Sequence, residues 1–363
     1  MSLSDEQIRK IIEDTVKQIS GVGGETNPAP TCWLCDDPES AIQAAKASQQ
    51  QLMKLSLEER SRLIEAMRTA AREQVNYLSE LAHTETGYGK VADKIKKNLL
   101  AINKTPGVED LPTSAMSGDY GLTLVECAPF GVIGSITPST NPTSSVINNS
   151  ISMIAAGNAV VYNPHPAAKK ASIETMRILN EAIVKAGGPA ALICTVKNPT
   201  LETGKYIMEH PDIPLLSITG GEAVVKVAMK TGKKVIAAGP GNPPVIVDDT
   251  ADIKKAAKDI VDGASFDNNV LCIAEKEVFA ISEIVEPLMR HMEQNGAYRL
   301  TGSDIEKVVK TVFLQDNGKY VINRKFVGRD ATYIAKESGV SYTGEPRLLI
   351  ASAVGVAVGL IAP

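Results

Sequence analysis

Short apolar runs alternate with amphipathic segments through the middle of the chain, between residues 132 and 238. The apolar runs have the length of strands, and the segments between them carry apolar residues at helical spacing. This alternation predicts right-handed β–α–β units and a parallel sheet that is covered on both faces. The expected strands are 132–136, 159–162, 193–196, 215–218 and 235–238, and the expected helices are 144–156, 167–186, 201–209 and 222–230.

Polar or glycine-rich residues follow three of these predicted strands, at 137–141, 163–166 and 219–221. Ligands of an open parallel sheet bind outside the carboxyl ends of its strands. We therefore expect a nucleotide-sized ligand at this edge. The glycine pattern GxGxxG of standard dinucleotide sites follows none of the strands, so a dinucleotide would have to bind in another way.

The regions on either side extend this picture. Residues 38–83 are predicted to be helical, with Ser56 and Glu59 forming a capping box. We expect a nucleotide-binding domain over residues 36–246, with a strand-like arm near 111–127. A second α/β domain is expected over 247–363, and it carries Cys272.

The first residues form a separate unit. Isoleucine and valine recur at helical spacing along 4–19, which predicts an amphipathic helix within residues 1–20. Residues 21–35 contain glycines and prolines and are expected to be a linker. A detached amphipathic helix either binds a partner or folds back on its own domain, and the pattern alone leaves both open.

Cys272 is the candidate nucleophile, and Asn141 is the candidate donor of a hydrogen bond to an oxyanion. A thiol and an amide donor are the minimum equipment for chemistry through a thioester. Each residue also has a structural alternative. Taken alone, Cys272 is more often a buried core residue, and Asn141 before Pro142 fits a turn.

Composition excludes several classes of protein. The chain has 363 residues, a formal charge of −4 and 4% aromatic residues, so nucleic-acid binding is not expected. Five cysteines, an odd number, fit free thiols in a reducing compartment, with Cys127 and Cys194 as core residues. The histidines lack the spacing of a metal site. The apolar stretch 348–362 falls short of the ~20 residues of a membrane span, so no membrane is expected.

Five segments of the chain, in one order, resemble the aldehyde dehydrogenase superfamily. They are CAPFGVIGSITPSTNP at 127–142, VVYNPHP at 160–166, SITGG at 217–221, AGPGNPP at 238–244 and NNVLC at 268–272. Within that superfamily they are similar to the CoA-acylating enzymes of bacterial microcompartments, which serve ethanolamine and propanediol breakdown. The resemblance implies an aldehyde dehydrogenase-like fold of two open parallel-sheet α/β domains plus the N-terminal amphipathic helix. It also implies a cytoplasmic location inside a microcompartment, with residues 4–19 docking on a shell protein.

The resemblance also implies roles for individual residues. Cys272 takes the position of the nucleophile and Asn141 that of the oxyanion donor. Cofactor-binding positions are implied at the ends of three strands: Thr137, Pro138, Asn163, His165, Thr219, Gly220 and Gly221. Thr219 to Gly221 match the turn that receives the pyrophosphate, and Asn163 and His165 match the strand end near the adenosine ribose. Common family members have a Lys where this chain has Asn163, which leaves the choice between NAD and NADP open.

Two departures from the family pattern bear on function. Ala238 stands where common members carry a general-base Glu, and no carboxylate lies between Glu222 and Asp248. The sequence after 350 does not match the family, so we expect the carboxyl end of the second domain to be incomplete. A dimer or tetramer is expected if the carboxyl tail is present.

The implied reaction is NAD-dependent oxidation of a short-chain aldehyde, acetaldehyde or propionaldehyde, to its acyl-CoA through a thioester on Cys272. Coenzyme A is the co-substrate, and no metal is needed. Two alternatives remain at this stage. One is a non-acylating dehydrogenase that yields a carboxylate, and the other is a truncated, non-catalytic protein associated with the shell.

Overall fold

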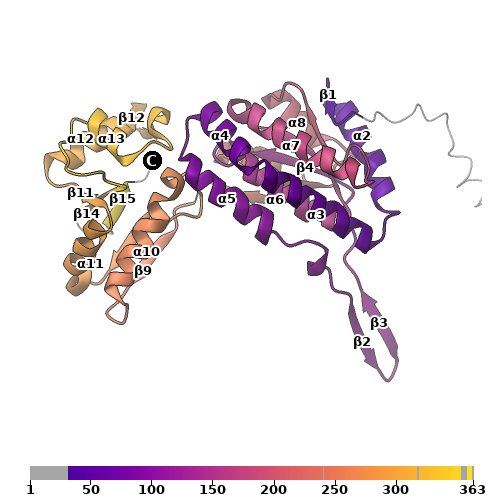
Figure 1. Cartoon of the computed structure of the whole chain (residues 1–363), viewed down its shortest axis with the longest axis horizontal. Helices are drawn as coiled ribbons and strands as arrows, with labels where there is room; N and C mark the ends of the chain where they lie inside the picture. Colours follow the sequence, from indigo (N-terminus) through magenta and orange to yellow (C-terminus); the bar gives the residue numbers. More distant parts are fainter. Residues whose placement is uncertain (1–31, 240, 317–318, 353–357, 362–363) are drawn as a thin grey trace, which may run out of the picture.

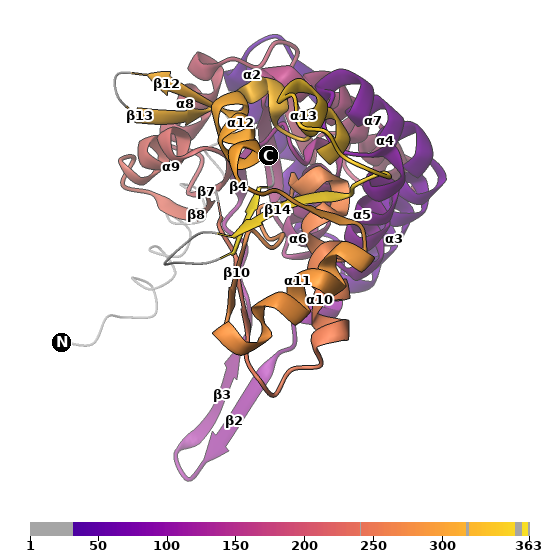
Figure 2. The ribbon, with the colours of Figure 1, turned by 90° about the vertical axis from the view of Figure 1, so that its left-hand side faces the viewer.

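The computed structural model describes residues 32–239, 241–316, 319–352 and 358–361 (Figure 1). The predicted amphipathic helix at 4–19 and most of the predicted linker lie outside the described residues. Two sheets with their helices lie side by side, and a two-stranded arm projects from the larger part (Figures 1 and 2).

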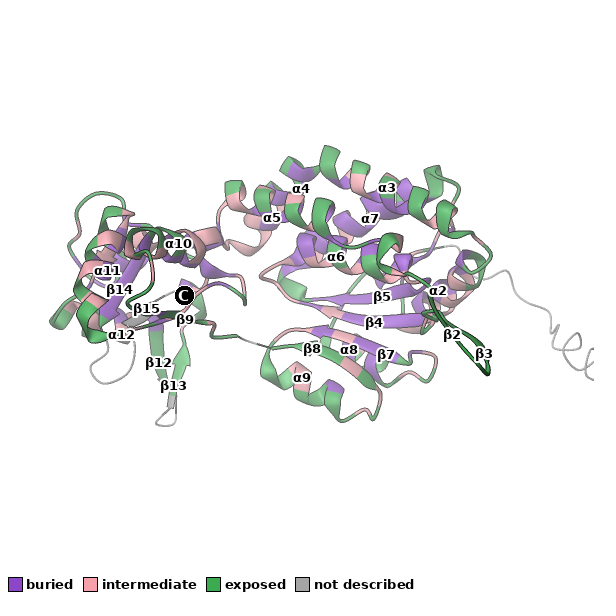
Figure 3. Cartoon of the chain, turned by 90° about the horizontal axis from the view of Figure 1, so that it is seen from below, coloured by how far each residue is buried: buried purple, intermediate pink, exposed green. Residues whose placement is uncertain are grey.

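The larger sheet has six strands, all parallel, in the order β1-β6-β5-β4-β7-β8. Every strand predicted between residues 132 and 238 is confirmed. The strands are β1 (Leu34–Cys35), β4 (Val132–Thr137), β5 (Ala159–Pro164), β6 (Ile193–Val196), β7 (Leu215–Thr219) and β8 (Lys234–Ala238). The strands β5 and β6 are buried along their whole length, as expected for a sheet covered on both faces (Figure 3).

Helices cover both faces of this sheet (Figure 3). One face packs against α6 (Pro142–Ala155) and α7 (Lys169–Lys185). Behind these two lie α3 (Leu57–Glu73), α4 (Val75–Thr86) and α5 (Val91–Lys104). The opposite face packs against α2 (Pro38–Leu52), α8 (Leu201–Glu209) and α9 (Glu222–Met229).

The predicted helical region at 38–83 is built from α2, α3 and α4, and the capping box of Ser56 and Glu59 is present at the start of α3. Helix α5 was not predicted. Its inward positions include Lys94, Lys97 and Asn98, so buried polar residues interrupt the apolar pattern that would have revealed it. This helix supplies side chains to the site described below.

The second sheet has five strands among the described residues, in the order β11-β14-β15-β10-β9. Strand β15 runs antiparallel to both of its neighbours, so this sheet is mixed and not wholly parallel as predicted. Its strands are β9 (Pro244–Val247), β10 (Glu277–Ala280), β11 (Ala297–Arg299), β14 (Leu348–Ser352) and β15 (Val358–Ile361). Helices α10 (Ile253–Ser265) and α11 (Ser282–Gln294) share one apolar cluster with it, and α12 (Ser303–Val312) and α13 (Ala331–Glu337) share another. The domain boundary at 246 remains a prediction.

Two antiparallel hairpins stand apart from the sheets. One joins β12 (Phe313–Asp316) to β13 (Lys319–Ile322). The other joins β2 (Ser114–Gly118) to β3 (Gly121–Val125), within the predicted arm near 111–127, and all its residues are exposed (Figures 1 and 3). Cys127, at the base of this arm, is exposed, so its expected place in the core was wrong; Cys194 is buried as expected.

The strand order places the site. From β4 the chain proceeds outward through β5 and β6, and then returns to the other side of β4 with β7 and β8. Loops leaving β4 and β7 therefore diverge and open a crevice at their carboxyl ends. Pro138 to Asn141 follow β4, and Gly220 and Gly221 follow β7.

Candidate active site

A pocket of about 410 Å³ lies at this crevice. Residues from the larger sheet's loops line it, together with residues from the part of the chain that carries the second sheet. It brings together Cys272, Asn141, Pro138, His165 and the turn Thr219 to Gly221, which are residues predicted from the sequence. The other lining residues were not assigned to catalysis or cofactor binding from the sequence, although Ala238 was singled out as the position without a base: Tyr88, Ser139, Thr140, Ala238, Gly239, Gly241, Asn269, Val270, Leu271, Lys276, Arg324 and Val327.

The loop that carries Cys272 is held in an uncommon backbone conformation. Three consecutive residues, Asp267, Asn268 and Asn269, have φ values of 49°, 51° and 59°. Asp and Asn tolerate this left-handed region better than other residues with side chains. The Asn-rich approach to the nucleophile is therefore a conformational requirement of the loop.

Each of the three side chains is also anchored. Asn268 donates to the carbonyl of Gly328 (3.0 Å), and Asn269 donates to the carbonyls of Ala264 (2.7 Å) and Glu275 (3.0 Å). These bonds fix the loop between α10 and β10. Cys272 itself is exposed to the pocket, so its thiol is accessible to a substrate.

Asp267 is fully buried and binds two lysines of α5. Its Oδ2 accepts from Lys94 Nζ (3.1 Å) and Lys97 Nζ (2.5 Å), and its Oδ1 accepts from the backbone N–H of Lys90 (2.8 Å). Its own N–H donates to Asp93 Oδ2 (3.1 Å). The nucleophile loop is thus joined to the first part of the chain by buried ionic contacts.

Asn141 is oriented by the same cluster. Its Oδ1 accepts a hydrogen bond from Lys97 Nζ (2.8 Å), and its Nδ2 donates to Thr140 Oγ1 (3.1 Å). An ammonium group donates and never accepts, so this contact fixes which end of the amide is the oxygen. One N–H of Nδ2 is left for an acceptor in the pocket.

Lys276 is a cation on the nucleophile loop that sequence reasoning missed. Its ammonium contacts Asn269 Oδ1 and donates to the carbonyls of Leu271 (3.2 Å) and Ala274 (3.3 Å). Burial lowers the pKa of Lys276, and the neighbouring Cys272 and Glu275 oppose that shift. Catalytic thiols are commonly found in electropositive surroundings of this kind.

The turn after β7 leaves room for an anion. Gly221 precedes the first residue of α9, and a Cβ placed on it would meet no atom within 4 Å. The N–H groups at the start of a helix favour negative charge. Glu222 in the first turn is itself paired with Lys226, at 2.6 Å.

The predicted residues Thr137 and Asn163 do not line this pocket. Thr137 is buried, and its hydroxyl has no hydrogen-bond partner within the described part of the chain. Asn163 donates to the carbonyl of Thr200 (3.0 Å) and accepts from Thr203 (2.7 Å), so both ends of its amide are engaged within the chain. Its role is to join β5 to the start of α8.

Asn163 instead borders a second, apolar cleft of about 320 Å³ between α8 and α9. The cleft is bounded by Leu201, Gly204, Val224 and Val227, among others. It adjoins the ends of β4 and β5, where the sequence predicts the adenosine end of a nucleotide. An apolar slot of this size suits a flat aromatic ring.

His165 lines the main pocket together with Arg324. Its Nδ1 accepts from the backbone N–H of Ala167 (3.1 Å), which caps the short helix η2 (Pro166–Ala168). Burial and the nearby Arg324 lower the pKa of His165. It is placed to border a ligand, and its Nδ1 is already used.

Of the described residues that line the main pocket, none is Asp or Glu. Ala238, at the end of β8, is exposed to the pocket. From the sequence, this residue was expected to stand where common members of the aldehyde dehydrogenase superfamily carry a general-base Glu. The arrangement can therefore form a thioester on Cys272 and stabilise an oxyanion, but it offers water no carboxylate base.

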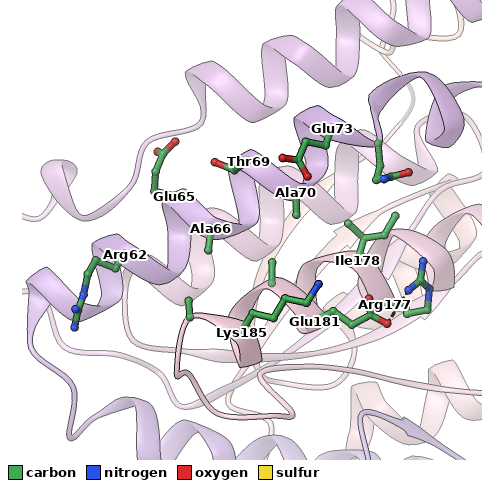
Figure 4. A pocket seen from close by; sticks show the side chains of 13 residues that line it. Arg62, Glu65, Ala66, Thr69, Ala70, Glu73, Arg177, Ile178, Glu181 and Lys185 are labelled. Carbon is green, nitrogen blue, oxygen red and sulfur yellow. Dashed lines mark hydrogen bonds and ion pairs between the residues drawn. The ribbon is translucent and has the colours of Figure 1, made fainter.

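A larger hollow of about 690 Å³ lies on the outer surface between α3 and α7 (Figure 4). Small side chains such as Ala66, Ala70 and Ala182 line it, together with charged side chains. Arg177 pairs there with Glu181 at 2.7 Å. None of the described residues that line it is a Cys, Ser or His, so it provides no equivalent chemistry.

Gly241 allows close approach to the nucleophile. A Cβ on Gly241 would come within 2.5 Å of the carbonyl oxygen of Cys272, whereas a Cβ on Gly239 would meet nothing within 4 Å. We expect Gly241→Ala to displace Cys272 and lower kcat/KM at least tenfold, since small misplacements of a reacting group are costly. Gly239→Ala is the matched control and should stay within about twofold. Equal kinetics for the two variants would contradict this prediction.

The comparisons with known proteins agree with the fold. A model of the aldehyde dehydrogenase family matches residues 34–311. An acetylating acetaldehyde dehydrogenase of Bilophila wadsworthia is 48% identical over 87% of this chain and 66% of its own length. A CoA-propanoylating propanal dehydrogenase of Salmonella typhimurium is 45% identical over 86% of this chain and 66% of its own length.

Solved structures agree as well. A propionaldehyde dehydrogenase from the fucose utilisation microcompartment of Clostridium phytofermentans has a TM-score of 0.85 and 47% identity, covering 88% of this chain and 73% of that one. A Rhodopseudomonas palustris propionaldehyde dehydrogenase with bound CoA and an acylated cysteine has a TM-score of 0.85 and 42% identity, with the same coverage.

This chain belongs to the aldehyde dehydrogenase family, and the predicted aldehyde dehydrogenase-like α/β fold is confirmed. Its similarity to acylating members confirms the resemblance derived from the sequence motifs. The chain spans about two thirds of the length of the curated relatives it matches, for example 66% of the Bilophila enzyme. Over the part of the chain that is described, no helix is long and apolar enough to cross a membrane.

Proposed function

We propose that this chain oxidises a short-chain aldehyde, acetaldehyde or propionaldehyde, to its acyl-CoA, with NAD as hydride acceptor and coenzyme A as co-substrate. The observation that carries the proposal is the pocket itself: Cys272 and Asn141 share it, and no described lining residue is a carboxylate. The acylating activities named for its relatives support the same reaction.

The residues present fit a dinucleotide. The turn Thr219 to Gly221 would hold the pyrophosphate at the start of α9, and the apolar cleft between α8 and α9 would hold the adenine ring. Bound NAD would supply the hydride acceptor. Thr200 and Thr203 each bind one end of the Asn163 amide and so fix its orientation beside this cleft.

The chemical steps follow from the protein side chains. The thiolate of Cys272 attacks the aldehyde carbonyl carbon, and a C–S bond forms as the carbonyl oxygen takes the negative charge. The amide Nδ2 of Asn141 and the backbone N–H of Cys272 donate to that oxygen. Loss of hydride to the acceptor leaves an acyl thioester on Cys272. Coenzyme A, having lost its thiol proton to solvent, then attacks the acyl carbon as a thiolate; the bond from that carbon to Cys272 breaks, and the Cys272 thiolate leaves.

Ala238 protects the thioester from water. General-base assistance to water is typically ~10²–10⁴-fold, whereas a thiol is intrinsically a better nucleophile and depends on it less. A pocket without a base therefore slows hydrolysis selectively and keeps the acyl group for coenzyme A. A non-acylating dehydrogenase would need a base that the described pocket does not supply.

The test follows NAD reduction with propionaldehyde, with and without coenzyme A, in the full chain. We expect turnover only with coenzyme A, and loss of at least a thousandfold in Cys272→Ala, since removing the nucleophile of a covalent mechanism is typically worth that much or more. Cys127→Ala, an exposed thiol outside the pocket, is the matched control and should keep wild-type turnover.

Turnover without coenzyme A would favour the hydrolytic alternative. Absence of NAD binding in the folded chain would favour the non-catalytic, shell-associated alternative.

Assembly and location belong to the proposal as well. The hairpin β2–β3 exposes Met116, Leu122 and Leu124 on an arm that projects from the body, which suits pairing with a second copy in a dimer or tetramer (Figure 2). A relative from a microcompartment supports a cytoplasmic location inside such a compartment. Residues 4–19 are proposed to bind its shell protein.

A further inference from the structure

Lys97 is the one side chain that contacts both the proposed oxyanion donor and the buried carboxylate of the nucleophile loop, among the contacts described. Its Nζ lies 2.8 Å from Asn141 Oδ1 and 2.5 Å from Asp267 Oδ2. It is 8% exposed, and it comes from α5, which the sequence motifs of the family resemblance do not include.

We propose that Lys97 is a positioning residue: its ammonium holds Oδ1 of Asn141, so that the Nδ2 group faces the reacting carbonyl and donates a strengthened hydrogen bond to the oxyanion. This inference rests on the proposed function and deepens it. Two physical arguments support it.

The first argument is orientation. An amide side chain can present either its oxygen or its nitrogen to the pocket, and an oxygen there would repel an oxyanion. The ammonium of Lys97 can only donate hydrogen bonds. It therefore binds the Asn141 amide with Oδ1 towards Lys97, and it excludes the orientation with Nδ2 towards Lys97. Asp267 holds Lys97 in turn, and both of these side chains are buried.

The second argument is polarisation. A charged donor on the carbonyl oxygen of an amide withdraws electron density and makes the N–H at the other end a stronger donor. The effect is largest where water is excluded, as at Lys97 and Asp267. The charge on Lys97 therefore matters in addition to its shape.

The charge can be removed by raising the pH. Burial and the neighbouring ammonium of Lys94 lower the pKa of Lys97 to about 8, against the opposing effect of Asp267 and Asp93. Below that pH the charged ammonium of Lys97 polarises the Asn141 amide. Above that pH Lys97 is a neutral amine, which polarises the amide less. We expect kcat to fall as pH rises through about 8.

Lys94 provides the matched control. It binds the same Asp267 oxygen at 3.1 Å and is also buried, but the contacts described for its ammonium do not include Asn141. Lys97→Met should lower kcat about tenfold, less than the ~10²–10³-fold cost of losing an oxyanion donor outright, and should abolish the alkaline fall. In Lys94→Met, kcat should still fall at alkaline pH, but at a higher pH than in the wild type. The reason is that removing the repelling charge of Lys94 raises the pKa of Lys97.

The deciding experiment measures kcat against pH for the full chain with propionaldehyde, NAD and coenzyme A, for wild type, Lys97→Met, Asn141→Ala and the double variant. If Lys97 acts through Asn141, Lys97→Met changes kcat less than twofold in the Asn141→Ala background. Two results would overturn the positioning role alone. One is that Lys97→Met lowers kcat by the same factor with and without Asn141→Ala. The other is that kcat of Lys97→Met still falls at alkaline pH as it does in the wild type. No turnover in folded wild type would instead overturn the proposed function, and the catalytic role of Lys97 with it.

Discussion

Ala238→Glu is expected to convert this chain into an enzyme that reduces NAD with aldehyde in the absence of coenzyme A. Ala238 is exposed to the pocket that holds Cys272 and Asn141, so a carboxylate there can reach water near the thioester. General-base assistance typically contributes ~10²–10⁴-fold to such a step. We expect CoA-independent turnover to rise about a hundredfold, with the free carboxylate as product, as measured by NADH formation and product analysis.

Ala238→Gln is the control for this gain. Glutamine has the same shape as glutamate but cannot take a proton from water, so its CoA-independent rate should stay at the wild-type level. A rise of similar size in both variants would mean that the longer side chain acts by opening the loop to water, and the argument from the missing base would be wrong. The gain in Ala238→Glu should also be lost at acid pH, where the carboxylate is protonated.

The second large effect is on stability. Asp267→Asn keeps the size of the side chain but removes the only carboxylate seen to bind the buried ammonium groups of Lys94 and Lys97 directly among the described contacts. Breaking a buried ion pair from one side typically costs about 3–5 kcal/mol, because an unpaired charge is left in the interior. We expect a loss of this size in the free energy of unfolding at pH 6.5, measured with urea.

The loss should shrink at pH 9, because burial lowers the pKa of Lys97 to about 8, so Lys97 can lose its proton in the folded protein and avoid the cost of a buried charge. Asp36→Asn is the control, since Asp36 and Lys197 form a surface pair at 2.7 Å with side chains that are 83% and 51% exposed. Such pairs are worth about 1 kcal/mol or less. Similar losses in the two variants would show that the buried cluster contributes no more than a surface pair.

Much of the fold is predictable from the sequence because its central sheet is simple. The strands β4 to β8 are short apolar runs that stand between helices with regular apolar spacing, and the polar loops at their ends mark the ligand edge. Cys272, Asn141 and the turn Thr219 to Gly221 were predicted from sequence motifs and do meet in one pocket.

What could not be predicted depends on contacts between distant residues. Lys94 and Lys97 resemble solvent-exposed lysines of an ordinary helix until Asp267, more than 160 residues later, is brought against them. Because these polar residues occupy the inner face of α5, the helix lacks the apolar pattern by which its buried face could be predicted. The sequence marks Asn163 as a strand-end residue near the ribose, but only the structure shows that Thr200 and Thr203 bind both ends of its amide.

The contact between α5 and Asp267 also constrains the order in which the protein can become active. Closing a loop of 170 residues costs chain entropy, and a fold that depends on such long-range contacts forms more slowly than one built from local contacts. Until they form, the left-handed turn at 267–269 lacks the partners that hold it, and Asn141 lacks the cation that orients it. A chain in which this contact has not formed therefore has the thiol of Cys272 but no oriented oxyanion donor beside it.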